Sequence, residues 1–531
     1  MFLSSLDLFV VAAYAVILFA IAQWVSREPK GEHKSTEDYF LAGKSLPWWA
    51  IGASLIAANI SAEQIIGMSG QGFAVGLAIA AYEWQAALVL IIVAVFFLPI
   101  FLKREIYTMP QYLDQRFGHT VKTTMSVYWI FLYTAVNLTT VLWLGALAVN
   151  TLTGLPLFTG MAALGAFALA YSMYGGLKAV ALTDIIQVVI LIMGGLIIAW
   201  MTMGIIGQGD GVMAGFKRLY TEIPGKFDMI LDKDHPAYSD LPGIWTLLGG
   251  LWVLHFSYWG FNQYIIQRAL GAKSLQEAQK GLVFAAFLKL LMPVIIVLPG
   301  IAAVMLAMPE MGSVIDGNAL AEKSDRAYPE VMKLMPSGLK GLIFAALIAA
   351  IVSSLASMMN SISTIFTMDV YKSWKSDRTE EHYVKVGRIT AFVAIVIAVF
   401  LAKPLLGSLE SAFQTLQEYT GYIAPGVVAV FLMGMFWRKT TSAAAMAMLI
   451  VSIVANVALK FGMADLAFVI RIWLVFLACL AVGFIVSQFS AKANDSNDIL
   501  LSDISFATTS GFKIMVAIII AVLVALYVVF W

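Results

Sequence analysis

Long apolar stretches separated by short polar segments recur from one end of the chain to the other. About fourteen of them are long enough to cross a bilayer, because a transmembrane helix needs roughly 20 mostly apolar residues. They fall near residues 4–26, 47–76, 78–102, 120–150, 156–174, 178–205, 243–268, 276–308, 338–371, 384–403, 409–436, 440–460, 466–489 and 511–531. Two longer polar stretches, 207–242 and 309–337, are predicted to form ordered external loops. The pattern predicts an all-α integral membrane protein.

Composition agrees with this class and excludes others. Hydrophobic residues make up 61% of the chain and charged residues 12%, which is about half the charged fraction of a soluble domain. A net charge of +1 argues against a nucleic-acid partner. The one cysteine, Cys479, lies in an apolar run, so no disulfide framework or thiol metal site is expected. The first apolar run lacks the features of a cleavable signal peptide, and Met1 is expected to begin the mature chain.

Basic residues predict the orientation of the spans. In short loops, Lys and Arg mark the cytoplasmic side. The loops after odd-numbered spans carry most of them: Arg27, Lys30, Lys34, Lys44, Lys103, Arg104, Arg116, Lys122, Lys178, Arg268, Lys273, Lys280, Lys372, Lys375, Arg378, Lys385, Arg388, Arg438, Lys439, Lys492 and Lys513. These loops are therefore predicted to be cytoplasmic, and both termini to lie outside.

The second span is too polar at its middle for a plain lipid-facing helix. Residues 54–64 read SLIAANISAEQ. Polar groups at bilayer depth are costly and often mark a transport pathway. We predict a helix interrupted near 57–64, where unpaired carbonyls hold a cation. The alternative is a small-residue packing face whose hydroxyls are satisfied by the preceding turn. Glu63 and Gln64, which follow at once, favour the functional interpretation.

Three further polar positions lie inside predicted spans. Glu83 and Lys289 have no partner of opposite charge nearby in sequence. They either pair inside the bundle or supply charge-assisted hydrogen bonds to a polar solute. The aromatic segment 255–260, HFSYWG, offers a face that can stack on a sugar ring, although core packing is the commoner role. His255 is either a satisfied interior side chain or a proton carrier.

The ninth span places two adjacent hydroxyls, Ser353 and Ser354, in an apolar run. Hard cations take about six oxygen ligands, and two hydroxyls with backbone carbonyls would form a plausible set. Back-bonding to the preceding turn explains the hydroxyls equally simply. Asp184 begins the sixth span as either a dipole-stabilised carboxylate or an ion-exit ligand. Residues 417–420, followed by Pro425, predict a kink with freed backbone groups.

These segments together resemble a known family. The similarity is carried by residues 35–49, 174–180, 258–268, 351–357 and 417–421. They resemble sodium/solute symporters, close to the bacterial sodium/galactose and sodium/glucose branch, over essentially the whole chain. The resemblance implies one transmembrane domain with a leucine-transporter-like core. Two inverted five-helix repeats would occupy 47–205 and 243–436, with one extra helix at 4–26 and three at 440–531.

The resemblance also implies a role for each site residue. Backbone carbonyls of Ala57, Ile60 and Ala350 and the hydroxyls of Ser353 and Ser354 would bind sodium. The sugar positions would be Gln64, Glu83, His255, Tyr258, Lys289 and Gln417. The gate residues would be Met68, Tyr82, Phe413, Tyr258 and Trp259. The residues around the ion and its exit path would be Asn59, Asn137 and Asp184. Two positions depart from the galactose branch: His255 stands where an asparagine is usual, and Ala86 where a serine is usual.

The function implied is secondary active symport, not catalysis. Sodium influx would drive uptake of a neutral monosaccharide of the galactose or glucose type across a bacterial inner membrane, with sodium, sugar and lipid as the partners and no obligatory protein partner. Symport of an inositol, a sialic acid or an amino acid is the alternative. A transporter-fold sensor is disfavoured because no predicted cytoplasmic loop holds an output domain. An intramembrane enzyme is disfavoured because no His/Glu metal pair occurs at helical spacing.

Overall fold

A computed structural model describes residues 3–26, 44–106, 108–174, 177–408, 411–490 and 501–531, and their regular structure is helical apart from one isolated bridge, Leu46–Ala272. The first α-helices are α1 (Ser5–Ser26), α3 (Trp48–Asn59), α4 (Ser69–Ala74), α5 (Ala81–Ile92), α6 (Leu98–Lys103), α7 (Met109–Phe117), α8 (His119–Phe131), α9 (Thr139–Thr153), α10 (Leu157–Tyr174), α11 (Leu177–Ile206), α12 (Val212–Glu222), α13 (Ile244–Leu248) and α14 (Leu251–His255). Segments 27–43 and 175–176, which carry part of the sequence resemblance, lie outside the described residues.

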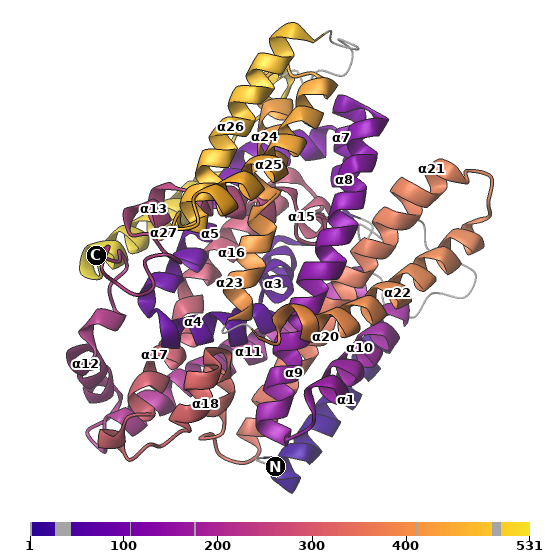
Figure 1. Cartoon of the computed structure of the whole chain (residues 1–531). Helices are drawn as coiled ribbons and strands as arrows, with labels where there is room; N and C mark the ends of the chain where they lie inside the picture. The colour runs from indigo at the N-terminus through magenta and orange to yellow at the C-terminus, as the bar shows by residue number, and fades with distance from the viewer. Residues whose placement is uncertain (1–2, 27–43, 107, 175–176, 409–410, 491–500) are drawn as a thin grey trace.

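The second half of the chain continues the bundle. Its α-helices are α15 (Gln263–Leu270), α16 (Leu275–Ile295), α17 (Val297–Leu306), α18 (Gly317–Glu322), α19 (Ala327–Met332), α20 (Leu339–Thr364), α21 (Lys372–Trp374), α22 (Glu380–Leu406), α23 (Ala412–Gly421), α24 (Ala424–Phe436), α25 (Ser442–Gly462), α26 (Phe468–Phe489) and α27 (Ser510–Val529). Figure 1 shows α3, α16 and α23 near the centre, with α1, α22 and α26 toward the edges. This arrangement confirms the predicted all-α fold.

The predicted spans correspond to these helices. Within the described residues, nine helices are long and apolar enough to cross a membrane, and two bent pairs qualify as broken spans. Two shorter apolar helices, Ser5–Leu18 and Leu157–Ala170, match the first and fifth predictions. The remaining predicted span, 243–268, consists of the short helices α13 and α14, the π-helical segment η7 (Phe256–Gly260) and α15. Because this span is interrupted, none of its helices is long enough to meet the length criterion for a membrane-spanning helix.

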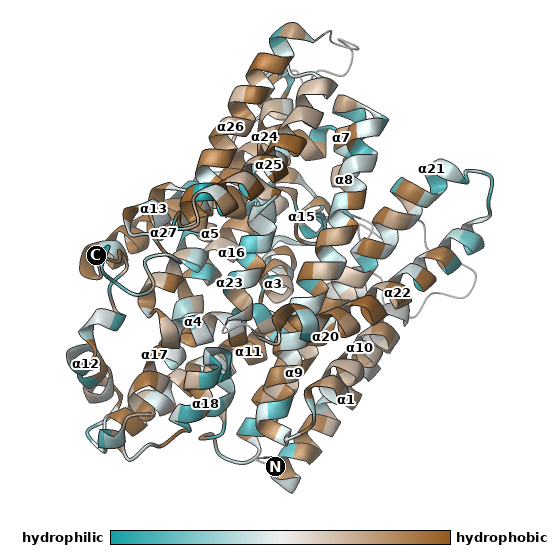
Figure 2. Cartoon of the chain, in the orientation of Figure 1, coloured by the Kyte–Doolittle hydropathy of each residue, from teal (hydrophilic) through white to brown (hydrophobic). Residues whose placement is uncertain are grey.

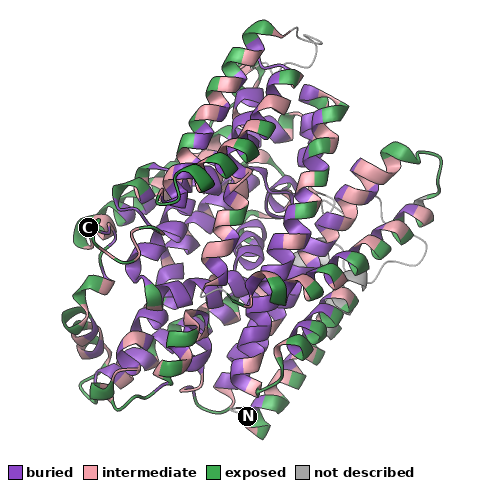
Figure 3. Cartoon of the chain, viewed as in Figure 1, coloured by how far each residue is buried: buried purple, intermediate pink, exposed green. Residues whose placement is uncertain are grey.

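Apolar side chains cover the outside of the bundle. Phe9 of α1, Phe400 of α22 and Val528 of α27 are 70%, 64% and 74% exposed. Figure 2 shows hydrophobic residues along the peripheral helices, and Figure 3 shows that many of the same helices are exposed. Exposed apolar surface on this scale is expected where lipid is the solvent.

Small residues allow the central helices to approach closely. A Cβ atom added to Gly52 of α3 would lie 2.8 Å from the carbonyl oxygen of Gly281 in α16. A Cβ atom on Gly281 would in turn lie 2.7 Å from the Ile51 side chain. Small residues are typical of helix contacts in membranes because dispersion contacts between the backbones replace the missing hydrophobic drive. The contact places α3 directly beside α16, which carries Lys289.

Both long polar segments are ordered, as predicted. The 207–242 segment contains α12, and the 309–337 segment contains α18, the 3-10 turn η9 (Ser324–Arg326) and α19. The first segment packs on the C-terminal helix: the Met229 N–H donates to the Phe530 carbonyl at 2.8 Å. The Phe227 and Phe530 rings also stack at 6.1 Å. These contacts fix the 207–242 segment against the end of α27.

Candidate functional site

The second span breaks where the sequence predicts a break. Helix α3 meets the segment formed by the π-helical η2 (Glu63–Met68) and α4 at a bend of 64°. The Ser61 N–H donates to the Asn59 carbonyl at 2.8 Å, two residues back, so Ala57 loses the donor that a regular helix would give it. Backbone freed in this way is the usual feature of ion sites in broken transmembrane helices.

A partly open cavity adjoins this break, with about 760 Å³ of empty space when the part that opens outward is counted. Its described lining residues are Asn59, Glu63, Gln64, Tyr82, Glu83, Tyr128, Trp129, Leu132, Asn137, Leu254, His255, Ser257, Tyr258, Trp259, Asn262, Lys289, Leu416, Gln417 and Thr420. Three π-helical segments contribute to it: η2, η5 (Leu132–Leu138) and η7 (Phe256–Gly260). Wide π turns often occur at functional sites because they re-aim side chains.

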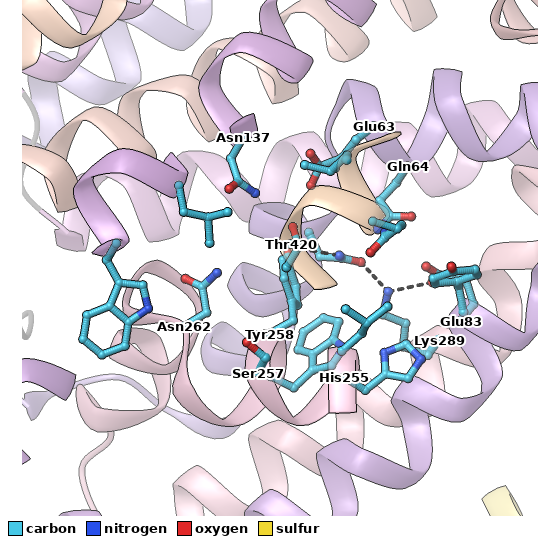
Figure 4. A pocket seen from close by; sticks show the side chains of 18 of the residues that line it. Glu63, Gln64, Glu83, Asn137, His255, Ser257, Tyr258, Asn262, Lys289 and Thr420 are labelled. Carbon is cyan, nitrogen blue, oxygen red and sulfur yellow. Dashed lines mark hydrogen bonds and ion pairs between the residues drawn. The ribbon is translucent and has the colours of Figure 1, made fainter. Parts of the chain in front are cut away.

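A buried ion pair crosses one side of the cavity. The Lys289 ammonium donates to Glu83 Oε2 at 2.6 Å and also to the Asn59 carboxamide oxygen, and it lies 4.8 Å from the centre of the Trp259 ring. Lys289 and Glu83 are each only 1% exposed. Figure 4 shows the lysine between its two oxygen partners, beside His255. The pair is charge-balanced, so this part of the cavity offers polar groups without a net charge.

Tyr258 joins the break to the segment that follows α14. Asn59 donates from Nδ2 to the Tyr258 hydroxyl at 3.3 Å, and the Tyr264 hydroxyl lies 3.3 Å from the same oxygen. Trp259 packs against Tyr258 at 5.1 Å between ring centroids. Through Asn59, Tyr258 is connected to Lys289 and Glu83. Movement of the tyrosine would therefore disturb the hydrogen bonds at the break and around the ion pair.

Five buried polar atoms at the cavity have no hydrogen-bond partner within the described part of the chain. They are Glu63 Oε2, Gln64 Oε1, Tyr82 Oη, Asn137 Oδ1 and His255 Nε2. An unpaired buried polar atom costs about 1–3 kcal/mol, and nearly all such atoms find partners in stable structures. Their convergence on one cavity is typical of a site that binds a solute with several hydroxyl groups.

Met68, Tyr82 and Phe413 are the gate residues expected on the outer side, and two of them pack against each other. The Tyr82 and Phe413 rings meet edge to face at 5.2 Å. A Cβ atom on Gly67 would lie 2.8 Å from Cβ of Phe413, so the glycine allows this approach. Met68 and Phe413 have no exposed surface and Tyr82 has 5%. Tyr82 lines the cavity, whereas Met68 and Phe413 lie outside its described lining.

The proposed sodium ligands belong to α3, to Ile60 directly after it and to α20, and α3 and α20 pack against each other. Ser353 donates from Oγ to Asp184 Oδ1 at 2.6 Å, which leaves its oxygen lone pairs available for a cation. The Ser354 Oγ atom is buried and has no partner among the described residues. Ala57, Ile60 and Ala350 are buried too. Hydroxyl and carbonyl oxygens are the ligands that hard cations prefer.

Asp184 is the centre of a buried network that the sequence did not predict in full. Ser54 donates from Oγ to Asp184 Oδ2 at 3.1 Å, and Arg268 donates to Ser54 Oγ at 2.8 Å. Arg268 also lies 3.4 Å from Asp184 Oδ2 and is 2% exposed. Its position 84 residues from Asp184 in the chain hides the pair from sequence patterns. Arg268 is absent from the described cavity lining, as is every other arginine.

The cavity brings together most of the predicted site residues. All six predicted sugar positions line it, along with Tyr82, Trp259, Asn59 and Asn137 from the other predicted sets. Asp184 lies in the separate serine network, and Ala86 is buried outside the described lining. The lining residues to which the sequence analysis assigned no role include Glu63, Asn262 and Thr420. Glu63 adjoins Gln64, and Thr420 follows Gln417 by three residues on one helix face. Their positions next to predicted site residues therefore indicated that both could line the cavity.

A membrane-spanning helical bundle with broken helices and a polar cavity at the break defines a secondary transporter. Residues 39–452 match the sodium:solute symporter family. The chain belongs to this family, whose members couple the transport of a solute to sodium.

Relatives of known name support this assignment. The chain is 50% identical over 537 residues to the sodium/glucose cotransporter of Vibrio parahaemolyticus, which covers 100% of this chain and 99% of that protein. It is 35% identical over 462 residues to human sodium/glucose cotransporter 4, covering 83% of this chain and 66% of the human protein. It is 34% identical over 472 residues to mouse sodium/myo-inositol cotransporter 2, covering 84% of this chain and 68% of the mouse protein.

Solved structures show the same fold. A sodium-coupled sialic acid symporter, in a substrate-bound outward-open state, matches with a TM-score of 0.79 at 23% identity, over 93% of this chain and 99% of that one. Mhp1, a nucleobase-cation-symport-1 transporter, matches with a TM-score of 0.52 at 15% identity, over 88% of this chain and 99% of that one. These likenesses place the bundle in the leucine-transporter-like class, as the sequence predicted.

Proposed function

We propose that the protein couples sodium influx to the uptake of a neutral monosaccharide of the galactose or glucose type. The observation that carries the proposal is the set of five unpaired buried polar atoms around one cavity, beside a charge-balanced Lys289–Glu83 pair. A sugar has hydroxyls that both donate and accept, so it can satisfy the amide, imidazole and phenol groups together. A solute with a negative charge would remain uncompensated, because the cation of the described lining, Lys289, is already paired with Glu83.

Sodium in this proposal binds between α3 and α20. Its ligands are the carbonyls of Ala57, Ile60 and Ala350 and the hydroxyls of Ser353 and Ser354. Support comes from the interrupted backbone at Ser61, from the unpaired Ser354 hydroxyl and from the Ser353 hydroxyl, which donates away from the ion position. Asp184 holds Ser353 and gives a leaving ion its next oxygen ligand.

Coupling follows from the shared break between α3 and α4. Sodium fixes the interrupted backbone that carries Asn59, and Asn59 bonds both Lys289 and Tyr258. Sodium favours the conformation in which its own ligands are assembled. The same conformation orders the solute site, so ion binding prepares the site for the solute. The outer gate, formed by Met68, Tyr82 and Phe413, closes over the bound sugar. Tyr258 then breaks its hydrogen bonds, and sodium and sugar leave toward the cytoplasm. A sodium ion moving down a membrane potential contributes roughly 2.3 kcal/mol per 100 mV.

The domain organisation in this proposal is one transporter unit with two inverted repeats, 47–205 and 243–436. The first span of each repeat is interrupted, just before η2 at Ile60 and Ser61 in one and just after η7 at Asn262 in the other. Paired interruptions in corresponding spans are typical of inverted-repeat transporters, whose binding site lies between the repeats. The protein would lie in the bacterial inner membrane with both termini outside, as the basic residues of the short loops indicate.

An inositol is the second candidate solute. His255 lines the cavity with an unpaired Nε2 atom. That single atom either donates or accepts, whereas the end of a carboxamide presents both a donor and an acceptor. This changes which hydroxyl arrangement the cavity satisfies. Sodium/myo-inositol cotransporter 2 of mouse is among the relatives. Monosaccharides and inositols are both neutral polyols, and the uptake measurement described next compares them directly.

The test is uptake into proteoliposomes with and without an inward sodium gradient, using labelled galactose, glucose and myo-inositol. We expect sodium-dependent uptake of a monosaccharide, lost in Gln64→Ala and in Ser354→Ala. Tyr220→Phe, on the exposed α12 helix, is the control and keeps normal uptake. Preferential uptake of myo-inositol would retain the symporter and replace the sugar. Uptake that is independent of sodium for every solute would refute the proposal.

A further inference from the structure

A second cavity lies away from the sugar site, among α1, α10, α11 and α20. It is partly open, with about 460 Å³ of empty space when the part that opens outward is counted, and its ten described lining residues include Tyr14 of α1, Phe167 of α10, Gln187 of α11 and Ala349 of α20. Eight of the ten are Val, Ala, Leu, Phe or Ile. None of the ten has a charged side chain at neutral pH. The proposed transport cycle does not use this space.

Two polar atoms in this apolar cavity have no partner. The Tyr14 hydroxyl and Gln187 Oε1 are buried and unpaired among the described residues. Tyr14 is 8% exposed and Gln187 is 2% exposed. Each unpaired buried atom costs free energy unless a water or a ligand satisfies it. A water molecule here would have only these two polar partners, the lower limit of the two to four that a buried water makes, and the eight apolar residues of the described lining would add none.

The cavity is placed to receive its occupant from the bilayer. Phe167 lines the cavity and is 40% exposed on the bundle surface. Val16, on the same helix as Tyr14, is 68% exposed. Figure 3 shows exposed residues along α1 and α10 at the edge of the molecule. A molecule dissolved in the membrane can thus reach the space without crossing an aqueous loop.

We propose that this cavity binds a neutral, membrane-dissolved amphiphile with an apolar chain and a single hydroxyl head. One hydroxyl can donate to Gln187 Oε1 and accept from the Tyr14 hydroxyl, which satisfies both unpaired atoms. The apolar chain fills the space between α1 and α20 and lies against Phe167 and Ala349. A carboxylate or phosphate head is disfavoured because no described lining residue carries a positive charge. The proposal does not depend on which solute the sugar cavity transports.

The site adjoins the proposed sodium ligands. Val352 lines the cavity and directly precedes Ser353. Gln187 follows Asp184 by three residues on α11, and Asp184 accepts from Ser353. An occupant held by Gln187 and packed on α20 therefore contacts both helices that carry the Ser353–Asp184 hydrogen bond. α1 is the only one of the four helices that lies outside the two proposed repeats, so the occupant would join it to them.

The test is photolabelling of the purified full chain in lipid nanodiscs with a diazirine analogue of dodecan-1-ol. We expect labelled peptides from α1 and α20, with labelling competed by dodecan-1-ol and not by dodecane or dodecanoate. Tyr14→Phe and Gln187→Met should each weaken labelling about fivefold, the effect of one lost hydrogen bond. Ala349→Phe should abolish it by filling the cavity. Tyr220→Phe is the matched control and should label normally.

Several outcomes would overturn the proposal. One is labelling spread evenly over the lipid-facing helices. Another is equal competition by dodecane, which would remove the role of the hydroxyl, or by dodecanoate, which would remove the neutral head. Unchanged labelling in both Tyr14→Phe and Gln187→Met would show that these atoms do not hold the ligand. Retention of the variants' thermal unfolding temperature confirms that a loss of labelling does not come from misfolding. Sodium-dependent uptake is measured separately, so failure of this site leaves the transport proposal intact.

Discussion

Asp325 Oδ2 accepts a hydrogen bond of 3.0 Å from the backbone N–H of Ala412. Ala412 is the first residue of α23, and the next residue is Phe413, which packs on Tyr82. Asp325 also lies against α4, because a Cβ atom on Gly70 would lie 2.8 Å from its Cα atom. One carboxylate from the 309–337 segment therefore ties α4 to the start of α23, next to the proposed outer gate.

This contact predicts a pH-dependent outer gate. Burial raises the pKa of the Asp325 carboxyl to about 7, against the opposing effects of the Ala412 N–H and the charge of Lys323. In an open state exposed to water the pKa would return to about 3.9. The closed state then binds more protons, so its stabilisation is fully present below about pH 4 and is lost as the pH rises through about 7. Raising the pH from 5 to 8 should therefore favour opening.

The measurement is the reaction rate of a cysteine at Met68, introduced by Met68→Cys, with a membrane-impermeant thiol reagent. The natural Cys479 is buried and serves as an unreactive background. We expect the rate, corrected for the thiolate fraction, to rise between pH 5 and 8. Asp325→Asn in the same background should remove that rise. An identical pH profile in both proteins would contradict the role of Asp325.

The Lys289–Glu83 pair should respond differently to single and double substitution. Glu83→Gln leaves the buried Lys289 charge unpaired, and losing one partner of a buried pair costs roughly 3–5 kcal/mol. The double variant Glu83→Gln/Lys289→Met has no uncompensated charge and should regain most of the thermal stability. Sugar binding should stay lost in the double variant if the pair contacts the solute. Recovery of binding together with stability would mean that the pair is only structural.

Ser354 should matter for sodium and little for folding. Its hydroxyl is buried and unpaired among the described residues, so Ser354→Ala removes no existing hydrogen bond. We expect the sodium concentration for half-maximal uptake to rise at least about tenfold, because a bond to a charged group is worth more than a neutral one. Ser361→Ala, also buried on α20, is the matched control. Equal sodium dependence in the two variants would exclude Ser354 as a ligand.

His255 should set the choice among polyols. Its Nε2 atom faces the cavity without a partner among the described residues, and His255→Leu should weaken sugar binding about tenfold by removing that group. His255→Asn should restore binding with a different ratio of galactose to glucose affinity, because a carboxamide both donates and accepts. Isothermal titration of the purified protein measures both. His235→Asn, in the 207–242 segment, is the control, and an unchanged ratio in His255→Asn would remove His255 from specificity.

The sequence was informative about the fold for a reason particular to membranes. Every backbone polar group in the bilayer must be bonded internally, so long apolar runs have one available structure, the helix. The same rule exposes exceptions: the polar residues 54–64 predicted the break that the structure places at Ile60 and Ser61. The apolar segment 243–268 predicts one span, yet its backbone is interrupted at Gly249 and at Asn262, so it forms α13, α14 with η7, and α15.

The sequence by itself therefore determined the class of protein, the number of apolar segments and which polar side chains lie inside the membrane-spanning segments. Tertiary structure alone decided their partners. Lys289 reaches Glu83 across 206 residues and Asn59 across 230, and Arg268 enters the Asp184 network from another helix. The spacing of apolar and polar residues along the chain predicts which residues are buried and which segments are helical, because both depend on residues close together in sequence. The pairing of buried charged side chains depends on how helices distant in sequence pack together, and only the folded bundle determines that packing.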